Sequence, residues 1–420
     1  MAPATTGGLP RSSFDINHHP NLLPPMLTAV CFRAPFAAIV LLAGASLASC
    51  TRAVPGTSGH DELVYIGTNI ADPQQNSIYL YHLSPATGEL LPLGAMKGGA
   101  SPTYLTMDAA HRHLYAVSET QTYMGAPGGG VSTLAIDPHN GTLAMLNQQP
   151  STGASPCYIS LDRTGKNALV ANYVGGNVAM LPVRADGQLD PAGATDQHQP
   201  PTGPHKNQDK PHAHCFVTSP DNRYAFSVDL GTDKVYGYQL DAAQHQLRLL
   251  PTPAFVTKPG TGPRHLVFHP NGRWAYLENE LNSTVSALTY NAAAGTFQEI
   301  ETLTQLPAGF AGDNSGADVH VSPDGRFLYT SNRGDNSLAV FAIDGASGHL
   351  ALVQHISTQG KTPRNFALDP SGQVLLVANQ NSDNVFTYHV DKQSGKLTST
   401  GKSVSLPSPM FVEVVSDFTR

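Results

Sequence analysis

The sequence predicts an all-β protein, a seven-bladed β-propeller with four antiparallel strands per blade, and three observations carry this prediction. The chain has 420 residues, of which 39 are Gly, 33 are Pro and only 13% are charged, so turn formers are plentiful and helix-favouring Lys and Glu are scarce. A pattern of short apolar runs recurs at intervals of about fifty residues, as expected for propeller blades. The two ends of the repeating region hold complementary halves of one repeat.

Each repeat begins with Pro or Gly followed by an alternating apolar run, which is typical of a strand. Seven such first strands can be read: SPTYLTMD (101–108), SPCYISLD (155–162), PHAHCFVTS (211–219), GPRHLVFHP (262–270), GADVHVSP (316–323), TPRNFALDP (362–370) and SPMFVEVV (408–415). Most are followed by a tight turn such as SPDNR, HPNGR, SPDGR or DPSGQ. In these turns Pro, Asp or Asn, and Gly set the backbone dihedrals.

Three further strands follow in each repeat. The second is again apolar, as in HLYAVSE, ALVANYV, YAFSVDL, WAYLENE, FLYTSNR and VLLVANQ. A polar connection leads to a third strand such as KVYGYQLD, TVSALTYN, SLAVFAID or NVFTYHVD, and a G-x-L type turn precedes a weaker fourth strand. Four antiparallel strands in each of seven repeats are the sequence signature of a β-propeller.

The two ends of the repeating region predict how the ring closes. ELVYIGT (62–68) is a second strand without a first, and SPMFVEVV (408–415) is a first strand without a second. Pairing them would complete the seventh blade and remove the open edge of the ring. Two packed β-sandwich domains are the alternative, but they give no reason for regular intervals or complementary ends.

The first sixty residues are expected to lie outside the propeller. Residues 1–25 contain no apolar run and are expected to be disordered or to precede the true start at Met26. Residues 26–50 carry one Arg, then an apolar stretch and then small residues, as a signal peptide does. Residues 51–60 then form a linker to a single propeller domain over residues 61–420.

The leader ends in LASC (47–50), which resembles a bacterial lipobox. Cys50 would then be the lipidated first residue of the mature protein, anchored in the cell envelope or periplasm. A plain secretory signal with a chance Cys is the alternative.

Composition argues against several partners. The net charge of −7 is mild and no Lys or Arg cluster stands out, so nucleic acid is not an expected partner. Outside the leader only Cys157 and Cys215 remain, each within an apolar run, and we interpret them as small buried residues rather than a disulfide. No cofactor is predicted, a monomer is expected, and the membrane is reached only through Cys50.

Polar side chains are predicted to gather at one face of the propeller. The first two strands of a repeat form an antiparallel hairpin, so the start of the first and the end of the second lie at the same face. On that face, nearest the axis, we expect the following residues: His212, His214, Arg264, His265, Glu280, Asp318, His320, Asn332, Arg333, Arg364 and Asn365. Solvation of a rim alone would spread such charge more evenly among the blades.

These segments carry a family resemblance. GPRHLVFHPNGRWAYLENEL, HAHCFVTSPDNRYAFSVDLGTDKV, VSPDGRFLYTSNRGDNSLAVFAID and TPRNFALDPSGQVLLVANQNSDNVFTYHVD resemble the lactonase family of seven-bladed propellers, over roughly residues 61–416. That family includes bacterial 6-phosphogluconolactonase and the fungal carboxy-muconate cyclase. A single SPDGR turn is common among propellers, whereas the ordered set PHAH, GPRH, NEL and SNRGDNS is specific.

The resemblance implies functional residues at matching positions. The His of PHAH is His212 or His214, the Arg of GPRH is Arg264, the Glu of NEL is Glu280 and the Arg of SNRG is Arg333. One departure stands out: relatives often have TPRH where this chain has TPRN. That replaces an imidazole with the amide of Asn365.

Lactone hydrolysis requires an activated water and a donor to the oxyanion, and we assign catalytic roles to Glu280, Arg264 and His212. Glu280 would accept the water proton or hold a His that does, and its alternative is a salt bridge that only closes the pocket. Arg264 offers a fork of donors to an anionic group, and its alternative is an ion pair between blades.

Further residues are predicted to bind substrate: His214, His265, Arg333, Asn332 and Arg364. Because His212 and His214 lie two apart on a strand, they share a face, and either suits a general base near neutral pH. The H-x-H spacing also suits a metal, but no further ligands complete a coordination set, so no metal is predicted.

Three functions remain open from the sequence. The first is a lactonase acting on a sugar-derived lactone, and the second is an isomerase of the muconate-cyclase type. The third is a non-catalytic binding propeller of the cell envelope. A cytosolic phosphosugar lactone is an awkward substrate for an exported protein, so the leader and the family's best-known substrate point in different directions.

Overall fold

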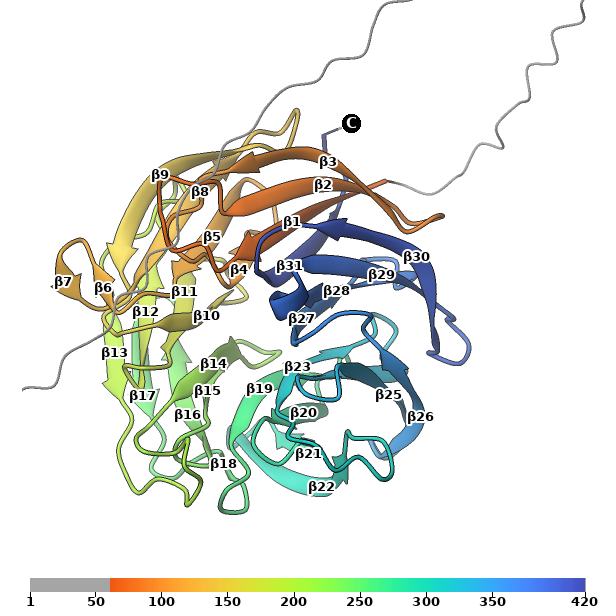
Figure 1. Ribbon diagram of the computed structural model, residues 1–420. Coiled ribbons are helices and arrows are strands. Elements are labelled where there is room, and N and C mark those ends of the chain that lie inside the picture. The colour runs from red at the N-terminus through yellow and green to blue at the C-terminus, as the bar shows by residue number, and fades with distance from the viewer. Residues whose placement is uncertain (1–60, 420) are drawn as a thin grey trace, which may run out of the picture. The chain divides into compact units, whose positions relative to one another are not determined.

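The computed structural model describes residues 61–419, which lie within one compact unit, Thr57–Arg420. They form seven antiparallel sheets, each built on a path of four strands, which follow one another round a ring (Figure 1). This confirms the predicted seven-bladed β-propeller. The segment predicted to be disordered, the leader with Cys50 and the linker lie outside the described residues.

The first three blades come from the N-terminal half of the ring. Blade 1 comprises β4 (Leu105–Met107), β5 (His113–Ser118), β8 (Gly130–Ile136) and β9 (Leu143–Pro150). Blade 2 comprises β10 (Pro156–Leu161), β11 (Asn167–Asn172), β12 (Asn177–Pro182) and β13 (Ala194–Gln197). Blade 3 comprises β14 (Ala213–Thr218), β15 (Tyr224–Asp229), β16 (Lys234–Asp241) and β17 (Gln246–Leu249), with β18 (Phe255–Val256) also paired to β16.

The remaining blades follow in chain order. Blade 4 comprises β19 (Pro263–Phe268), β20 (Trp274–Asn279), β21 (Thr284–Asn291) and β22 (Thr296–Thr304). Blade 5 comprises β23 (Gly316–Val321), β24 (Phe327–Asn332), β25 (Ser337–Ile343) and β26 (Leu350–Ser357). Blade 6 comprises β27 (Pro363–Leu368), β28 (Val374–Asn379), β29 (Asn384–Val390) and β30 (Leu397–Ser405).

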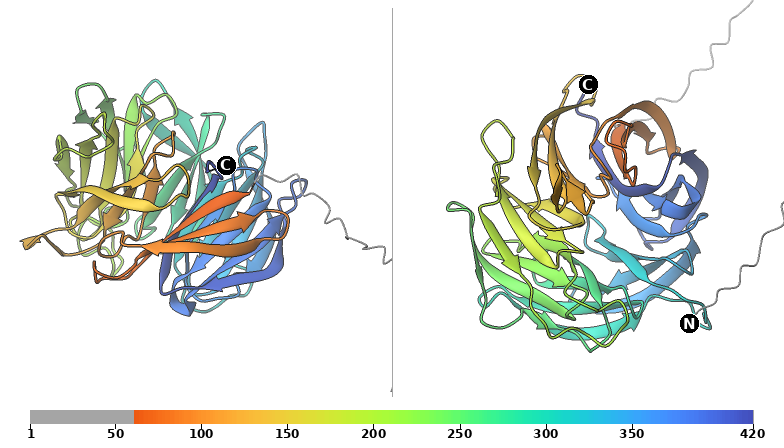
Figure 2. Two further views of the ribbon diagram at one scale, coloured as in Figure 1. Left: turned by 90° about the horizontal axis from the view of Figure 1, so that it is seen from above. Right: turned by 60° about the vertical axis from the view of Figure 1, so that its left-hand side comes forward.

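Blade 7 is assembled from both ends of the described chain. It joins β31 (Pro409–Ser416) to β1 (Glu62–Thr68), β2 (Ile78–Ser84) and β3 (Glu89–Met96). β31 and β1 pair antiparallel, from Glu62 opposite Ser416 to Gly67 opposite Phe411. The views in Figures 1 and 2 show the blue C-terminal strand beside the orange N-terminal ones. The predicted closure is therefore confirmed.

The first strand of each repeat is the innermost strand of its blade. The inner strands contact one another in the order β31, β4, β10, β14, β19, β23, β27 and back to β31. Several hairpins of first and second strands turn on the predicted pattern, as in SPDNR, HPNGR, SPDGR and DPSGQ. In HPNGR, the Gly272 amide donates to the His269 carbonyl at 2.9 Å, and its φ of +69° suits glycine.

Tyrosines of several second strands tie their blade to the next one. Tyr276 on β20 donates to the carbonyl of Gly348 at 3.2 Å, and Tyr329 on β24 donates to Gly395 at 3.0 Å. In each case the glycine lies in the turn between the third and fourth strands of the following blade. The apolar cores lie in the same interfaces, because Trp274 of blade 4 packs in one cluster with residues of blade 5.

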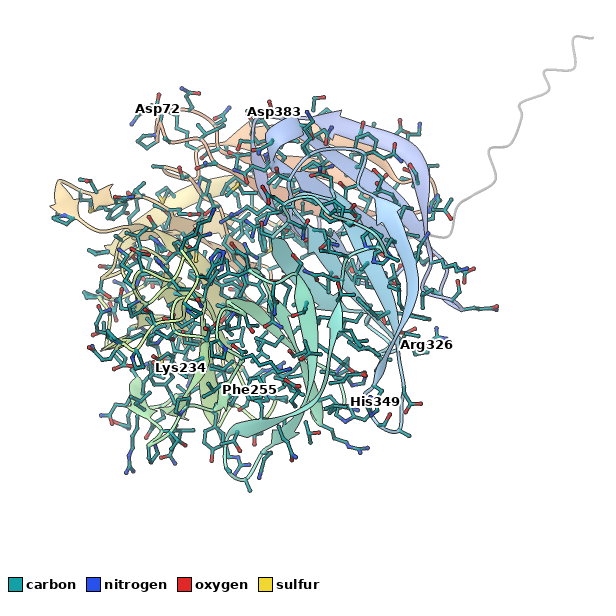
Figure 3. All side chains as sticks on the ribbon, turned by 60° about the horizontal axis from the view of Figure 1, so that its bottom comes forward. Asp72, Lys234, Phe255, Arg326, His349 and Asp383 are labelled. Atoms are coloured by element: carbon teal, nitrogen blue, oxygen red, sulfur yellow. The ribbon has the colours of Figure 1, made fainter. Side chains whose placement is uncertain are left out.

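Other features agree with the composition. Cys157 and Cys215 are free and buried, as predicted. Turn residues such as Arg326 and His349 lie at the surface (Figure 3), with side chains 52% and 54% exposed. The Gly-rich run 125–130 contributes to a small hairpin of β6 (Thr122–Tyr123) and β7 (Ala126–Pro127), and η1 (Gln380–Ser382) is a single 3-10 turn. Within residues 61–419 no helix has the length and apolar character needed to cross a bilayer.

Glu62 at the start of β1 makes stability depend on pH. Its side chain is buried, its Oε2 has no hydrogen-bond partner among the described residues, and burial together with the charge of Asp369 raises its pKa to about 8. Because the folded pKa exceeds the unfolded one, this contribution to stability is complete below about pH 4.5 and is lost as pH rises through about 8. Glu62→Gln keeps the shape of the side chain without the ionisation.

We expect Glu62→Gln to raise the melting temperature relative to the unsubstituted protein at about pH 9 and to leave it nearly unchanged at about pH 5. Thermal unfolding followed by circular dichroism at both values measures this difference. The exposed Glu299→Gln serves as a control with no pH-dependent effect. An equal shift for Glu62→Gln at both pH values would contradict the assignment.

Candidate functional site

Irregular pairing at the start of the inner strands positions the polar side chains. In β14, β19 and β27 the register shifts so that one residue is left between two paired positions. These extra residues are His214, Arg264 and Arg364, which occupy equivalent places in blades 3, 4 and 6. A bulge of this kind re-aims a side chain out of the strand's normal alternation. The three basic side chains therefore occupy the same structural position in their repeats.

Glu280 is the first residue after β20. Its backbone amide donates to Gly262 at 2.8 Å, which holds the residue beside the first strand of its own blade. Glu280 Oε2 lies 3.0 Å from Arg264 Nε and 2.8 Å from Arg333 Nη2. One carboxylate oxygen is thus shared by two guanidinium groups from neighbouring blades.

The cluster carries more positive than negative charge. Burial by itself would raise the pKa of Glu280, but the charges of Arg333, Arg264 and Arg364 outweigh burial and hold it below its ordinary value. Burial lowers the pKa of Arg333, and the neighbouring arginines add to that effect. Arg364 is half-buried and has no hydrogen bond or ion pair within residues 61–419. Its guanidinium therefore has unused donors within this part of the chain.

Arg264 is the largest of the fully buried side chains, and it is fixed on two sides. Its Nε faces Glu280, and its Nη1 donates to the carbonyl of Ala317 on β23. The same Nη1 lies 3.1 Å from Nε2 of His265. No hydrogen bond to Nη2 is made within the described part of the chain, so this donor stays available.

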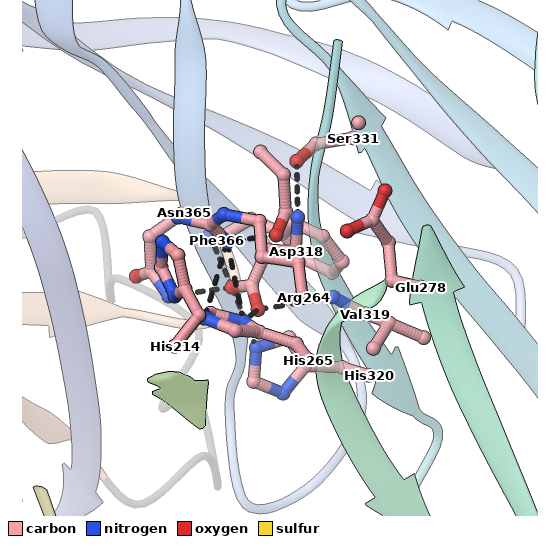
Figure 4. Close-up of polar contacts among 12 residues, drawn as sticks. His214, Arg264, His265, Glu278, Asp318, Val319, His320, Ser331, Asn365 and Phe366 are labelled. Carbon is pink, nitrogen blue, oxygen red and sulfur yellow. Dashed lines mark hydrogen bonds and ion pairs between the residues drawn. The ribbon is translucent and has the colours of Figure 1, made fainter. Parts of the chain in front are cut away.

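Behind Arg264, the carboxylate of Asp318 on β23 joins three side chains (Figure 4). Its Oδ1 lies 2.8 Å from His265 Nδ1, and its Oδ2 lies 3.0 Å from His320 Nε2. Asn365 Nδ2 donates to Oδ2 at 2.5 Å, and Asn365 Oδ1 accepts the backbone amide of Val412 at 2.8 Å. The amide that replaces the family's imidazole at this position therefore links blade 5 to blades 6 and 7.

The pKa values of this group follow from its contacts. Burial would raise the pKa of Asp318, but the charge of His320 and the hydrogen bonds from both histidines hold it far below its ordinary value. Burial and the charge of Arg264 lower the pKa of His265 to about 4, so its imidazole is neutral near pH 7. Burial would lower the pKa of His320, but the charge of Asp318 outweighs burial and raises it.

Glu278 on β20 is a second buried carboxyl next to Arg264 (Figure 4). It is fully buried, and burial raises its pKa to about 8 despite the opposing charge of Arg264. Gln305 Nε2 lies 3.1 Å from its Oε1, whereas its Oε2 has no partner among the described residues. Near pH 7 this side chain is mostly protonated and does not offset the arginines.

The two histidines of the PHAH segment have different surroundings. His212 stacks on Tyr173, and its ring nitrogens lie 3.0 Å from the Tyr173 carbonyl and 2.9 Å from Asp209. His214 lies with its ring 5.1 Å from that of His265, and its Nδ1 has no partner within residues 61–419. Burial and the charges of Arg264, His265 and Arg364 hold the pKa of His214 well below its ordinary value.

Asn332, predicted to bind substrate, has its amide engaged with protein groups. Its Nδ2 donates to the carbonyl of Gln305 at 2.8 Å and to Ser337 Oγ at 3.2 Å. In blades 2 and 6, Asn172 and Asn379 donate in the same way to the carbonyls of Ser151 and Thr358. These asparagines brace the end of a second strand against the preceding blade, so the position of Asn332 is one that the repeat uses for structure.

The structure thus brings together Arg264, Glu280, Arg333, His265, His214 and Arg364, and it gives His212 and Asn332 separate contacts. Asp318 and Glu278 had no predicted role. A charged residue inside an otherwise apolar run, as in GADVHV and WAYLEN, is the sequence signal that marks both.

Aromatic side chains line the inner strands beside this cluster. The rings of Tyr104 and Tyr158 lie 4.2 Å apart, and Tyr104 also lies 4.2 Å from Phe411. The ring of Tyr158 lies 5.3 Å from that of His265. These aromatic side chains of blades 1, 2 and 7 therefore form a continuous set of ring contacts that ends at His265.

Two other features stay apart from the cluster. Within residues 61–419 no group of three or more His, Cys, Asp and Glu side chains is arranged to hold a metal ion. An open cleft of ≈ 500 Å³ lies at the turns of blades 1 and 2, lined in part by Arg112, Arg163 and Arg184. It contains none of the predicted site residues, and its arginines lie at the surface, so it is not the candidate site.

Similarity to known proteins extends over the propeller. Residues 63–414 match the protein family described as Lactonase, 7-bladed beta-propeller. The 6-phosphogluconolactonase of Bacillus subtilis is 37% identical over 350 residues, covering 83% of this chain and 97% of the relative. The 6-phosphogluconolactonase of Formosa agariphila is 35% identical over 341 residues, covering 80% of this chain and 94% of the relative.

A solved structure is similar over nearly its whole length. The periplasmic gluconolactonase of Pseudomonas aeruginosa has a TM-score of 0.76 and 37% sequence identity, covering 84% of this chain and 99% of that chain. The resemblance read from the motifs is thereby confirmed.

Glu280→Gln tests the charge balance of the cluster. It removes the carboxylate that faces Arg264 and Arg333, whose side chains are only 2% and 12% exposed. Breaking one partner of a buried ion pair costs about 3–5 kcal/mol, and we expect a loss of that order in urea unfolding at about pH 7. The exposed Glu299→Gln is expected to change stability by less than about 0.5 kcal/mol.

The same variant has an expected pH dependence. Because the folded pKa of Glu280 is lowered, its stabilisation is present above its ordinary value of 4.5 and is lost as pH falls through the folded pKa. The stability difference between the unsubstituted protein and Glu280→Gln is therefore expected to narrow on acidification. A small difference that stays constant with pH would show that the ion pairs do not stabilise the fold.

Proposed function

Because the chain belongs to the Lactonase family of seven-bladed β-propellers, we propose that it hydrolyses a sugar-derived lactone. The proposed active site lies on the central-channel face, where the inner strands β14, β19, β23 and β27 begin. The single observation that carries the proposal is the sharing of Glu280 by Arg264 and Arg333, with Arg364 left unpaired among residues 61–419. A buried site with this charge excess favours an anionic substrate or transition state.

Arg264 is proposed to stabilise the oxyanion. Attack of water on the lactone carbonyl places negative charge on the carbonyl oxygen, and a preorganised donor in a dry site lowers that barrier. Arg264 is held through its Nε and Nη1, and its Nη2 remains for the oxyanion. Collapse of the tetrahedral intermediate breaks the bond to the ring oxygen, which takes up a proton and leaves a hydroxyl and a carboxylate.

Glu280 is proposed to orient the attacking water. The arginines hold its pKa low, which makes it a weak base but keeps its carboxylate ionised. Oε2 is occupied by Arg264 and Arg333, and Oε1 has no hydrogen bond within the described residues. An ionised oxygen with a free lone pair accepts a hydrogen bond from water and fixes its direction.

His214 is proposed, in place of His212, to accept the proton. Its Nδ1 has no partner in the described part of the chain, whereas both nitrogens of His212 face protein oxygens. After the effect of burial, the charges that lower the pKa of His214 come from Arg264, His265 and Arg364. An anionic group bound at Arg364 offsets part of that charge and moves the pKa of His214 toward neutral pH, where a general base is most effective.

The cellular location bears on the substrate. We propose that the protein is exported and anchored through Cys50, which lies outside the described residues. The periplasmic gluconolactonase of Pseudomonas aeruginosa supports export of a relative with the same fold. A sugar lactone formed outside the cytoplasm reconciles the predicted leader with lactonase chemistry and does not require a cytosolic phosphosugar.

We expect the mature protein to hydrolyse gluconolactone, and gluconolactone 6-phosphate is the comparison substrate that reports on Arg364. His214→Gln is expected to lower kcat/KM about 10²- to 10⁴-fold, as loss of a general base does. His212→Gln is expected to have a smaller effect, and the exposed His139→Gln serves as the control. Proton release in a weakly buffered pH-indicator assay measures the rates.

Two outcomes would reject this proposal. If no lactone of a broad panel is hydrolysed, the binding propeller becomes the better interpretation. If His214→Gln and Arg264→Ala both keep the unsubstituted rate, the cluster around Arg264 and Glu280 is not the active site.

The anchor has its own test. Expression of the full chain in a bacterial host with globomycin, which blocks the lipoprotein signal peptidase, is expected to cause accumulation of the uncleaved precursor. A palmitate analogue is expected to label the unsubstituted protein and not the Cys50→Ser variant. Release of an unlabelled mature protein into the periplasm would show that Cys50 is not an anchor.

A further inference from the structure

The carboxylate of Asp318 is buried where the proposed reaction has no direct use for it. It is 1% exposed and accepts from His265, His320 and Asn365. The backbone amides of Val319 and Phe366 also approach it, at 3.0 Å and 3.4 Å. An ionised group with this many donors costs little to keep charged, whereas the same group without them would be protonated.

The contacts of His265 determine which ring nitrogen carries its proton. A carboxylate only accepts, so Nδ1, which lies 2.8 Å from Asp318 Oδ1, must donate. A guanidinium only donates, and Arg264 Nη1 lies 3.1 Å from Nε2 and 3.4 Å from Nδ1, so with Nδ1 protonated toward Asp318 the ring nitrogen that can accept from Arg264 is Nε2. The neutral tautomer with hydrogen on Nδ1 satisfies both neighbours, and either other protonation state places a hydrogen against Arg264.

Arg264 is therefore held from two sides. Glu280 faces its Nε, and the Ala317 carbonyl and His265 face its Nη1. Ala317 immediately precedes Asp318, so the same stretch of β23 supplies both the carbonyl that accepts from Arg264 and the carboxylate that contacts His265. Rotation of His265 or a change in its tautomer removes one of these supports and frees the guanidinium to turn.

We propose that Asp318 is a positioning residue of the lactonase site, which fixes the tautomer of His265 and thereby aims Arg264 Nη2 at the substrate. The effect of Asp318 on catalysis rests on the proposed function, whereas its effect on the tautomer of His265 does not. Asp318 acts through His265 and does not touch substrate. His320, Asn365 and the two amides keep it ionised, and Glu413 on β31 is the other carboxyl whose charge acts on His320.

The structural part is tested without any substrate. In protein with ¹⁵N-labelled histidine, the imidazole of His265, assigned by its absence in His265→Gln, is expected to show the Nδ1-protonated neutral form from about pH 6 to about pH 8. Asp318→Asn is expected to shift the signal toward the other tautomer or toward averaging. A His265 protonated on Nε2, or one that titrates near pH 6.5 in the unsubstituted protein, overturns the proposal even if Asp318→Asn does not fold.

The catalytic part is tested by a double-mutant cycle on the lactone that the protein hydrolyses. Asp318→Asn is expected to lower kcat about 10- to 100-fold with little change in KM, because it acts on the group that binds the oxyanion. In a His265→Gln background the same substitution is expected to have no further effect. Asp324→Asn, an exposed turn position of the same blade, is the matched control and is expected to keep the full rate.

The outcomes separate the two ideas. Multiplicative effects of Asp318→Asn and His265→Gln, or an unchanged kcat in Asp318→Asn, overturn the positioning role while leaving the lactonase proposal intact. If the unsubstituted protein hydrolyses no lactone, the proposed function fails, and the tautomer of His265 alone decides whether Asp318 positions Arg264.

Discussion

The candidate site depends on one buried charge balance, in which Glu280 is shared between Arg264 and Arg333. Two guanidinium groups packed together in a dry interior would repel each other, and the carboxylate between them removes most of that cost. Because the partners come from blades 4 and 5, the same contacts also join these blades. The balance is incomplete, since Arg364 from blade 6 adds a third positive charge without a carboxylate of its own within the described residues. In the proposed function, that remaining positive charge attracts an anionic substrate to the cluster.

The repeat explains how the cluster can be built at all. Blades 2, 3, 4 and 6 begin their inner strands with the same one-residue bulge, so a side chain placed there by one blade meets the corresponding side chains of its neighbours. Blades 3, 4 and 6 use this position for His214, Arg264 and Arg364. Blade 2 has Cys157 at this position. Burial raises the pKa of its thiol, which therefore stays protonated and unreactive. A change of one residue at this position thus alters the chemistry near the axis of the propeller. Asparagines such as Asn332 and tyrosines such as Tyr276 hold adjacent blades together.

Local pattern and antiparallel geometry were enough to predict the seven blades, the closure of the ring and the meeting of Arg264 with Glu280. All of these follow from alternation, turn chemistry and the pairing of adjacent strands. Contacts between blades were not predictable in the same way, because they depend on how separate sheets pack. Asp318 and His265 are 53 residues apart in the chain, and only the packing of blade 5 on blade 4 brings them together. The separate surroundings of His212 and His214 also follow from packing, since spacing alone placed both on one face.

Three carboxyl groups near Arg264 show why burial alone does not decide charge. Glu278, Glu280 and Asp318 are all enclosed by protein, yet burial raises the pKa of Glu278 to about 8 while the other two are held low. The difference lies in their partners, because Asp318 faces two imidazoles and an amide, Glu280 faces two guanidiniums, and Glu278 has a single amide donor. Because Arg264, Arg333 and Arg364 face the single carboxylate of Glu280, an ionised Glu278 would reduce the positive excess and weaken the attraction for an anionic substrate. Burial of Glu278 therefore preserves the positive character of the cluster, because it keeps this one carboxyl neutral.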